Sequence, residues 1–269
     1  MLIDSIVHAT ADGRWFGTHF DASANRLLRE MDEAGLAKAV LVGLASSATE
    51  NRELLDIASR HRDRLIPCGG FNPTAHTRND VGAAIRAEFH ETEFRAVKFH
   101  PRFGDFDIHD PRFLAALDEI ASWQRPIPIW LDTFLYRAKA PLRSDPVTAL
   151  HRLATTYPSL TFVFLHGTGA SLLPLYEAIR FCHNTFLDVS YTLCHYQGSS
   201  LDADLRWIAR HFDQRMLWGS DFPEIGIPDA LALARSLLCD IGQDKFANIT
   251  GLNLARIFSL SVESNGPSR

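Results

Sequence analysis

Several features that assign chains to common protein classes are missing from this sequence. Its four cysteines include no Cys-x-x-Cys pair, which argues against a zinc finger or a disulfide framework. The net charge of −5 comes from acidic and basic residues spread along the chain. Because no block of Lys and Arg is available to hold a phosphate backbone, we expect no nucleic-acid partner.

Long apolar runs are also missing. Charged or turn residues interrupt every apolar run before the roughly 20 residues that a membrane helix needs. The amino terminus lacks the basic start, apolar stretch and small-residue cleavage site of a secretory signal. We therefore expect a cytoplasmic protein with no membrane partner.

The sequence does contain a regular alternation of two kinds of segment. Short β-branched or aromatic runs are each followed by an amphipathic stretch, which is typical of βα units around a parallel sheet. We predict an α/β fold, a (β/α)8 or TIM barrel, with residues 1–260 as a single domain and residues 261–269 as a flexible tail. The eight predicted strands are Leu2–His8, Ala39–Leu44, Leu65–Phe71, Ala96–His100, Ile127–Asp132, Thr161–His166, Thr185–Ser190 and Met216–Ser220.

Amphipathic segments between these strands predict the helices of the barrel. An open dinucleotide-binding sheet is the alternative, but no Gly-x-Gly-x-x-Gly follows the first strand. A final stretch, Leu252–Leu260, predicts an extra helix. The other predicted helices include Asn25–Ala34, Asn51–Arg60, Pro111–Trp123, Pro146–Thr155, Leu201–His211 and Asp229–Leu238.

Polar side chains follow several predicted strands at their carboxyl ends, where the loops of such a barrel build the active site. Lys98, His100 and Arg102 alternate along one strand, so period-two geometry aims all three the same way. We predict that they bind an anionic substrate, and an ion-pair ladder is the structural alternative. The other strand-end residues are His8, Asp132, His166 and Asp221.

Four segments carry a resemblance to a known family. The most specific is 217–223, Leu-Trp-Gly-Ser-Asp-Phe-Pro. Segments 163–169 (Val-Phe-Leu-His-Gly-Thr-Gly), 186–190 (Phe-Leu-Asp-Val-Ser) and 251–258 (Gly-Leu-Asn-Leu-Ala-Arg-Ile-Phe) support it. Together they resemble the amidohydrolase-related (amidohydrolase 2) branch of the amidohydrolase superfamily. The resemblance implies a barrel whose strand-eight aspartate, here Asp221, binds metal and moves protons.

The resemblance is incomplete at two expected metal ligands. The family begins Asp-x-His-x-His or Asp-x-Glu-x-His, but here Ile6 replaces the first ligand, and the histidine expected on strand five aligns with Asp132. One interpretation is a Zn or Mn site. The other is that no metal binds and that Asp221 and His166 form an acid/base pair. The ligands implied by the first interpretation are His8, Asp132, His166 and Asp221.

Three functions remain open for a small-molecule substrate. The leading hypothesis is hydrolysis of an ester, lactone or amide, with Asp221 as general base and His166 or Lys98 stabilising the oxyanion. The second is metal-dependent decarboxylation of an aromatic or muconate-type acid. The third is a barrel that has lost its chemistry and keeps a binding or structural role. We expect a homodimer in each case.

Aromatic residues just after the strand ends are candidates for the wall of a pocket for a ring-sized substrate, although they could equally pack between loops. They are Trp15, Phe16, His19, Phe103, Phe134, Tyr136 and Tyr191.

Overall fold

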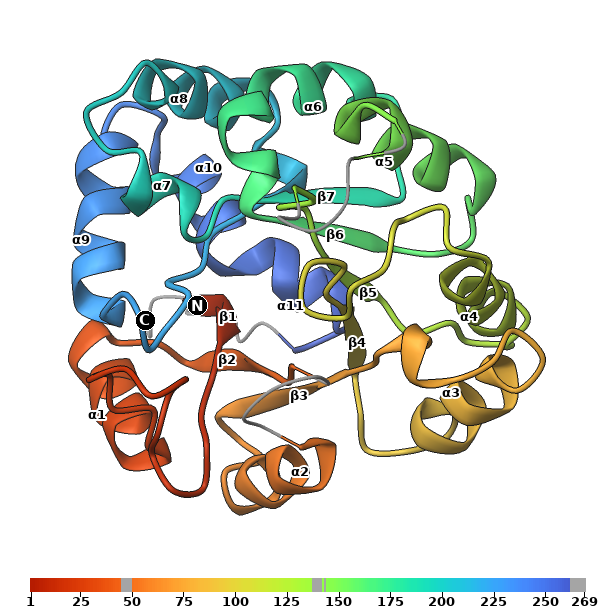
Figure 1. The fold of residues 1–269 in the computed structure, drawn as a ribbon. Helices are drawn as coiled ribbons and strands as arrows, with labels where there is room; N and C mark the ends of the chain where they lie inside the picture. The colour runs from red at the N-terminus through yellow and green to blue at the C-terminus, as the bar shows by residue number, and fades with distance from the viewer. Residues whose placement is uncertain (45–49, 137–141, 143, 262–269) are drawn as a thin grey trace.

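Eight parallel strands form one sheet in sequence order (Figure 1), in a computed structural model that describes residues 1–44, 50–136, 142 and 144–261. Backbone bonds from β1 to the segment at the end of β8 bring the two edges together, with Ser5 N 3.2 Å from Trp218 O and His8 N 2.9 Å from Phe222 O. The predicted (β/α)8 barrel is confirmed. The strands are β1 (Ile3–Val7), β2 (Lys38–Val42), β3 (Leu65–Gly70), β4 (Ala96–Phe99), β5 (Ile129–Asp132), β6 (Phe162–Leu165), β7 (Thr185–Asp188) and β8 (Met216–Leu217).

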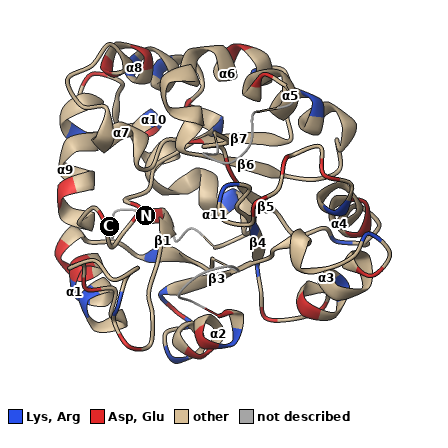
Figure 2. Ribbon diagram, viewed as in Figure 1, with Lys and Arg blue, Asp and Glu red and all other residues tan. Residues whose placement is uncertain are grey.

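Helices surround this sheet, and their outer faces carry basic and acidic residues intermixed (Figure 2). Asp110 and Asp145 accept hydrogen bonds from backbone N–H groups at the starts of α4 and α5, each of which opens with a proline. No helix among the described residues is long and apolar enough to cross a membrane. The helices are α1 (Ala24–Ala34), α2 (Asn51–Arg60), α3 (Val81–Phe89), α4 (Pro111–Ala121), α5 (Pro146–Thr156), α6 (Leu172–Ile179), α7 (Thr192–His195), α8 (Leu201–His211), α9 (Ile227–Leu237), α10 (Gln243–Ala247) and α11 (Asn253–Ile257).

The sheet separates two hydrophobic cores. Side chains alternate along β4, so that Val97 and Phe99 belong to the large core shared with the helices, while Ala96 belongs to the core inside the barrel. The inner core ends against Phe258, which lies just after α11. The ring of Phe258 stacks on Trp130 with their centroids 5.4 Å apart. Because apolar side chains fill this end, the cavity for a ligand lies at the other, carboxyl end of the strands.

Several predicted boundaries differ from the structure. The strand predicted to extend to Ser220 ends at Leu217, because Trp218 N bonds to Ile249 O and leaves the ladder with β7. Helix α9 begins at Ile227, two residues before the predicted start. The Ile227 N–H donates to the Glu30 carboxylate at 2.9 Å. Helix α11 is shorter than predicted, and α3, α6, α7 and α10 had not been placed. Of the predicted tail 261–269, residues 262–269 lie outside the described part of the chain.

Candidate active site

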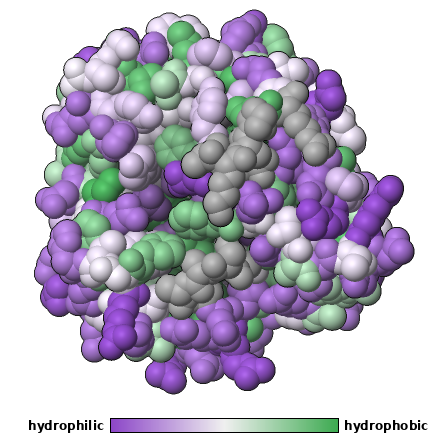
Figure 3. Space-filling model, in the orientation of Figure 1, coloured by the Kyte–Doolittle hydropathy of each residue, from purple (hydrophilic) through white to green (hydrophobic). Residues whose placement is uncertain are grey.

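A cavity of about 230 Å³ opens at the carboxyl ends of the strands. Figure 3 shows hydrophilic and hydrophobic side chains side by side around the hollow centre of this face. Charged groups and aromatic rings therefore border the same space. The described lining residues are His8, Trp15, Phe16, Leu44, Lys98, His100, Arg102, Phe103, Asp132, Phe134, His166, Tyr191, Asp221 and Glu224.

Two cations come from the β4 side of the cavity. Lys98 is 3% exposed, and no described residue makes a hydrogen bond or an ion pair with its ammonium. Burial lowers the pKa of Lys98, and the charges of Asp132 and Asp221 oppose that effect. The exposed Arg102 guanidinium lies over the rings of Phe103 and Phe134, at 5.4 and 5.8 Å. Both cations are thus available to an anionic ligand.

Asp132, at the end of β5, faces two imidazoles. Its Oδ2 lies 3.3 Å from Nε2 of His100 and 3.4 Å from Nε2 of His166. Burial opposes ionisation of Asp132, but His100, His166 and Lys98 nevertheless hold its pKa below the usual range. Burial lowers the pKa of His100 to about 3, although the charge of Asp132 acts in the opposite direction. The Asp132 carboxylate is therefore ionised, and its contacts with His100 and His166 hold it within the cavity wall.

The pKa of His166 is shifted towards the opposite charge. Burial acts to lower its pKa, but the hydrogen bond to Asp132 and the charges of Asp221, Asp132 and Asp188 raise it overall. Its Nδ1 lies 3.2 Å from Ser190 O, and a carbonyl can only accept, so this nitrogen carries a proton. His166 has a φ of 62°, and its N–H donates to Asp188 at 3.3 Å, which helps to hold this left-handed backbone. The arrangement presents a fixed imidazole whose Nδ1 carries a proton.

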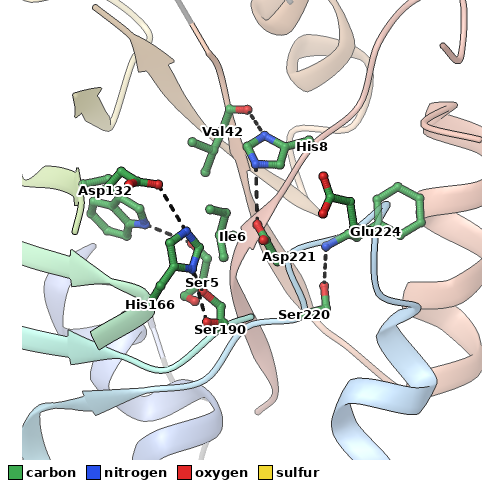
Figure 4. A network of polar contacts seen from close by, with 12 residues as sticks. Ser5, Ile6, His8, Val42, Asp132, His166, Ser190, Ser220, Asp221 and Glu224 are labelled. Carbon is green, nitrogen blue, oxygen red and sulfur yellow. Dashed lines mark hydrogen bonds and ion pairs between the residues drawn. The ribbon is translucent and has the colours of Figure 1, made fainter. Parts of the chain in front are cut away.

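His8 and Asp221 form a separate pair. Nδ1 of His8 lies 2.7 Å from Val42 O, and its Nε2 lies 3.7 Å from Oδ1 of Asp221 (Figure 4). Burial lowers the pKa of His8 well below its usual value, whereas burial raises the pKa of Asp221 against the charges of His166 and Lys98. A neutral imidazole thus turns its free lone pair towards a carboxylate that holds a proton more readily than usual.

The sequence of the chain matches the amidohydrolase family model over residues 9–259. The chain belongs to the amidohydrolase family. No curated protein matches it significantly. The predicted resemblance is thereby confirmed at the level of the family.

Three solved structures show the same fold as this amidohydrolase. A TIM-barrel protein of unknown function from Bordetella bronchiseptica has a TM-score of 0.75 at 19% identity, covering 96% of this chain and 98% of its own. A protein assigned as a 2-pyrone-4,6-dicarboxylic acid hydrolase from Pseudomonas putida has a TM-score of 0.71 at 20% identity, covering 97% and 98%. The 5-carboxyvanillate decarboxylase from Sphingomonas paucimobilis has a TM-score of 0.67 at 17% identity, covering 97% and 99%.

The donor groups of this amidohydrolase do not fit a single metal ion as they are arranged. The Ile6 side chain lies between the His8–Asp221 pair and the Asp132–His166 pair (Figure 4). Ile6 is fully buried and supplies no donor atom. Within the described residues, no three His, Cys, Asp or Glu side chains converge in a way that could hold a metal. The predicted ligand set therefore stays a prediction, and we derive no step from a metal.

Every predicted site residue of the amidohydrolase lines this one cavity, but their surroundings differ. The cavity interior is bordered directly by Lys98, Arg102 and Asp221, whereas His100 turns its Nε2 to Asp132. Five of the seven predicted aromatic residues line the cavity. His19 and Tyr136 do not: His19 packs on Phe20, and Tyr136 is 74% exposed.

Two carboxylates that matter to the site were missed in the sequence. Glu224 lines the cavity, and the only available signal was its place directly after the Ser-Asp-Phe-Pro segment. Asp188 lies beneath the cavity, fully buried, and accepts hydrogen bonds from the Ser5 and Ser190 hydroxyls. It belongs to the quoted segment 186–190, but nothing in the sequence indicated that it supports His166.

Proposed function

We propose that this amidohydrolase hydrolyses a C–O or C–N bond in a small anionic ester, lactone or amide. One observation carries the proposal: a partly buried carboxylate with a raised pKa, Asp221, and a buried ammonium that no described residue pairs with, Lys98, line the same cavity. The carboxylate is suited to accept a proton from water, and the ammonium is suited to bind negative charge.

Asp221 acts as the general base. A water molecule beside its carboxylate gives up a proton to Asp221 while its oxygen bonds to the carbonyl carbon. A carboxylate is a more effective base when its pKa lies nearer to the working pH, which is the direction in which burial shifts Asp221. The Nε2 lone pair of His8, directed at Asp221, orients the same water.

The negative charge that develops on the carbonyl oxygen is stabilised by His166 or by the Lys98 ammonium. When the intermediate collapses, the bond to the leaving oxygen or nitrogen breaks, and Asp221 returns its proton to that atom. Arg102, with Lys98, binds the anionic group of the substrate. The five lining aromatic rings suit a planar substrate body.

Decarboxylation is the second candidate, because a carboxyl group whose pKa is raised can also protonate a ring carbon. The decarboxylase from Sphingomonas paucimobilis shares the fold. Against it, no three donor side chains among the described residues converge to hold the metal that such a decarboxylation needs. A barrel without chemistry is the third candidate.

A screen that detects both reactions tests the proposal. The purified protein, with and without added Zn and Mn, is incubated with aryl esters, carboxylated lactones including 2-pyrone-4,6-dicarboxylate, carboxylated anilides and 5-carboxyvanillate. Hydrolysis is followed by acid release and decarboxylation by carbon dioxide. We expect hydrolysis of at least one carboxylated ester, lactone or amide. Carbon dioxide alone would support the second candidate, and no turnover at all would support the third.

A further inference from the structure

The cavity is electrically asymmetric. Its β4 side supplies the cations Lys98 and Arg102, whereas the segment after β8 supplies the carboxylates Asp221 and Glu224. Among the described lining residues, no Lys or Arg lies on the β8 side. A ligand that spans the cavity therefore meets positive charge at one end and negative charge at the other.

Glu224 is held in place within this asymmetric wall. Its Oε1 accepts a hydrogen bond from Trp15 Nε1 at 3.0 Å, and the Trp15 ring stacks on His8 at 4.9 Å. Figure 4 shows the Glu224 carboxylate beside His8 and Asp221. That bond from Trp15 is the one hydrogen bond of the Glu224 side chain among the described residues, which leaves acceptor capacity for a ligand.

The negative charge of Glu224 acts on its neighbours across the cavity. After the larger effect of burial, it contributes to the raised pKa of both Tyr191 and Asp221. A second carboxylate on a ligand at this end would be repelled by the same field. A hydroxyl or amino group would instead donate a hydrogen bond to Glu224.

We propose that Glu224 makes the cavity selective for a monoanion that carries a hydrogen-bond donor at the end opposite its carboxylate. Lys98 and Arg102 bind the carboxylate, and Glu224 accepts from the donor while excluding dicarboxylates. This inference rests on the proposed function in that it assigns the substrate class of the same site. It concerns binding, however, and binding can be measured without turnover.

Two probes of the same ring size separate the alternatives. Calorimetric titration compares 3-hydroxybenzoate, a monoanion with a donor, and isophthalate, a dicarboxylate with the same substitution pattern. We expect the wild-type protein to bind 3-hydroxybenzoate about tenfold more tightly, which is the effect of one close like-charge contact in a partly exposed site. Glu224→Gln keeps the shape of the side chain and should clearly reduce this ratio, with only the Asp221 carboxylate left at that end of the cavity. Glu33→Gln, at an exposed position on α1, is the matched control and should leave the ratio unchanged.

Lys98→Met tests the other end of the ligand. It should weaken both probes by a similar factor, because both place a carboxylate on the β4 side. Equal binding of the two probes by the wild type, an unchanged ratio in Glu224→Gln, or no binding of either probe would each overturn the inference. Neither probe has an ester, lactone or amide bond, so a failure of hydrolysis leaves this result intact. If the wild type hydrolyses a substrate but binds the two probes equally, the role of Glu224 is refuted and the proposed hydrolysis stands.

Discussion

Nε2 of His8 lies 3.7 Å from Oδ1 of Asp221, while Nδ1 of the same ring lies 2.7 Å from the carbonyl oxygen of Val42. The carbonyl fixes the proton on Nδ1, so the lone pair on Nε2 faces the carboxylate. A water molecule beside these two groups would meet two acceptors and no competing donor from the pair. This geometry is why we assign the general-base role to Asp221.

The pH dependence of hydrolysis should carry the signature of Asp221. The base must be ionised, and burial raises its pKa above the usual 3.8, so activity is lost as the pH falls through that raised value. We expect kcat/KM to fall about tenfold per pH unit on the acid side, with the bend displaced above the usual aspartate range. A profile that stays flat down to about pH 4 would contradict this assignment.

Lys98→Met should separate stability from activity. A buried ammonium that makes no hydrogen bond or ion pair with any described residue is costly, and Met has a similar length without the charge, so the variant should be at least as stable as wild type. The lost charged contact with the substrate should lower kcat/KM by about 10- to 100-fold. Thermal unfolding and steady-state kinetics on the same preparation check both effects. A marked loss of stability would show that Lys98 is a structural residue.

Asp132→Asn should destabilise the fold in a pH-dependent way. The lowered pKa of Asp132 contributes stability that is present above its unfolded pKa and lost as the pH falls through the folded value. The raised pKa of His166 contributes stability below its unfolded pKa that is lost as the pH rises through the folded value. Removing the carboxylate should therefore lower the free energy of unfolding most between about pH 4 and 6.5, by about 3–5 kcal/mol.

Urea unfolding of Asp132→Asn across this pH range provides the measurement. Asp56→Asn, at an exposed position on α2, is the control and should change the free energy of unfolding by less than about 0.5 kcal/mol. A cost for Asp132→Asn that does not vary with pH would argue against the ion pair with His166.

Gly219 should tolerate no side chain, for steric reasons. A Cβ at this position would collide with the Ser5 hydroxyl and lie 2.9 Å from Oδ1 of Asp4, at the junction of β1 and β8. Gly219→Ala should therefore cost about 1–3 kcal/mol in unfolding free energy. Gly82→Ala is the matched control within α3, because its Cβ would come no closer than 3.7 Å to Glu119. It should be neutral or stabilise by up to about 1 kcal/mol. Equal effects of the two changes would refute the steric explanation.

Much of the fold could be predicted because local patterns determine it. The alternation along the β4 segment predicts that Lys98, His100 and Arg102 point the same way, and all three line the cavity, because strand geometry sets that periodicity. The strand ends likewise locate the cavity, because carboxyl ends of parallel strands share one face. These inferences need no knowledge of long-range contacts.

The detailed pairing within the site could not be predicted in this way. That Ile6 separates His8 from His166 depends on how β1 and β6 are placed across the barrel, which no local pattern encodes. The contacts of Asp132 with His100 and His166 could not be predicted for the same reason. Glu224 was missed because its role depends on a hydrogen bond from Trp15, which lies 209 residues away in the sequence.

The most direct test of the account compares hydrolysis by Asp221→Asn and Asp56→Asn on the best substrate from the screen. Asp221→Asn keeps the shape of the side chain but cannot accept a proton from water, so kcat/KM should fall by about 10²- to 10⁴-fold. The exposed control should retain the wild-type value. A wild-type rate in Asp221→Asn would contradict the central claim that this carboxylate is the base.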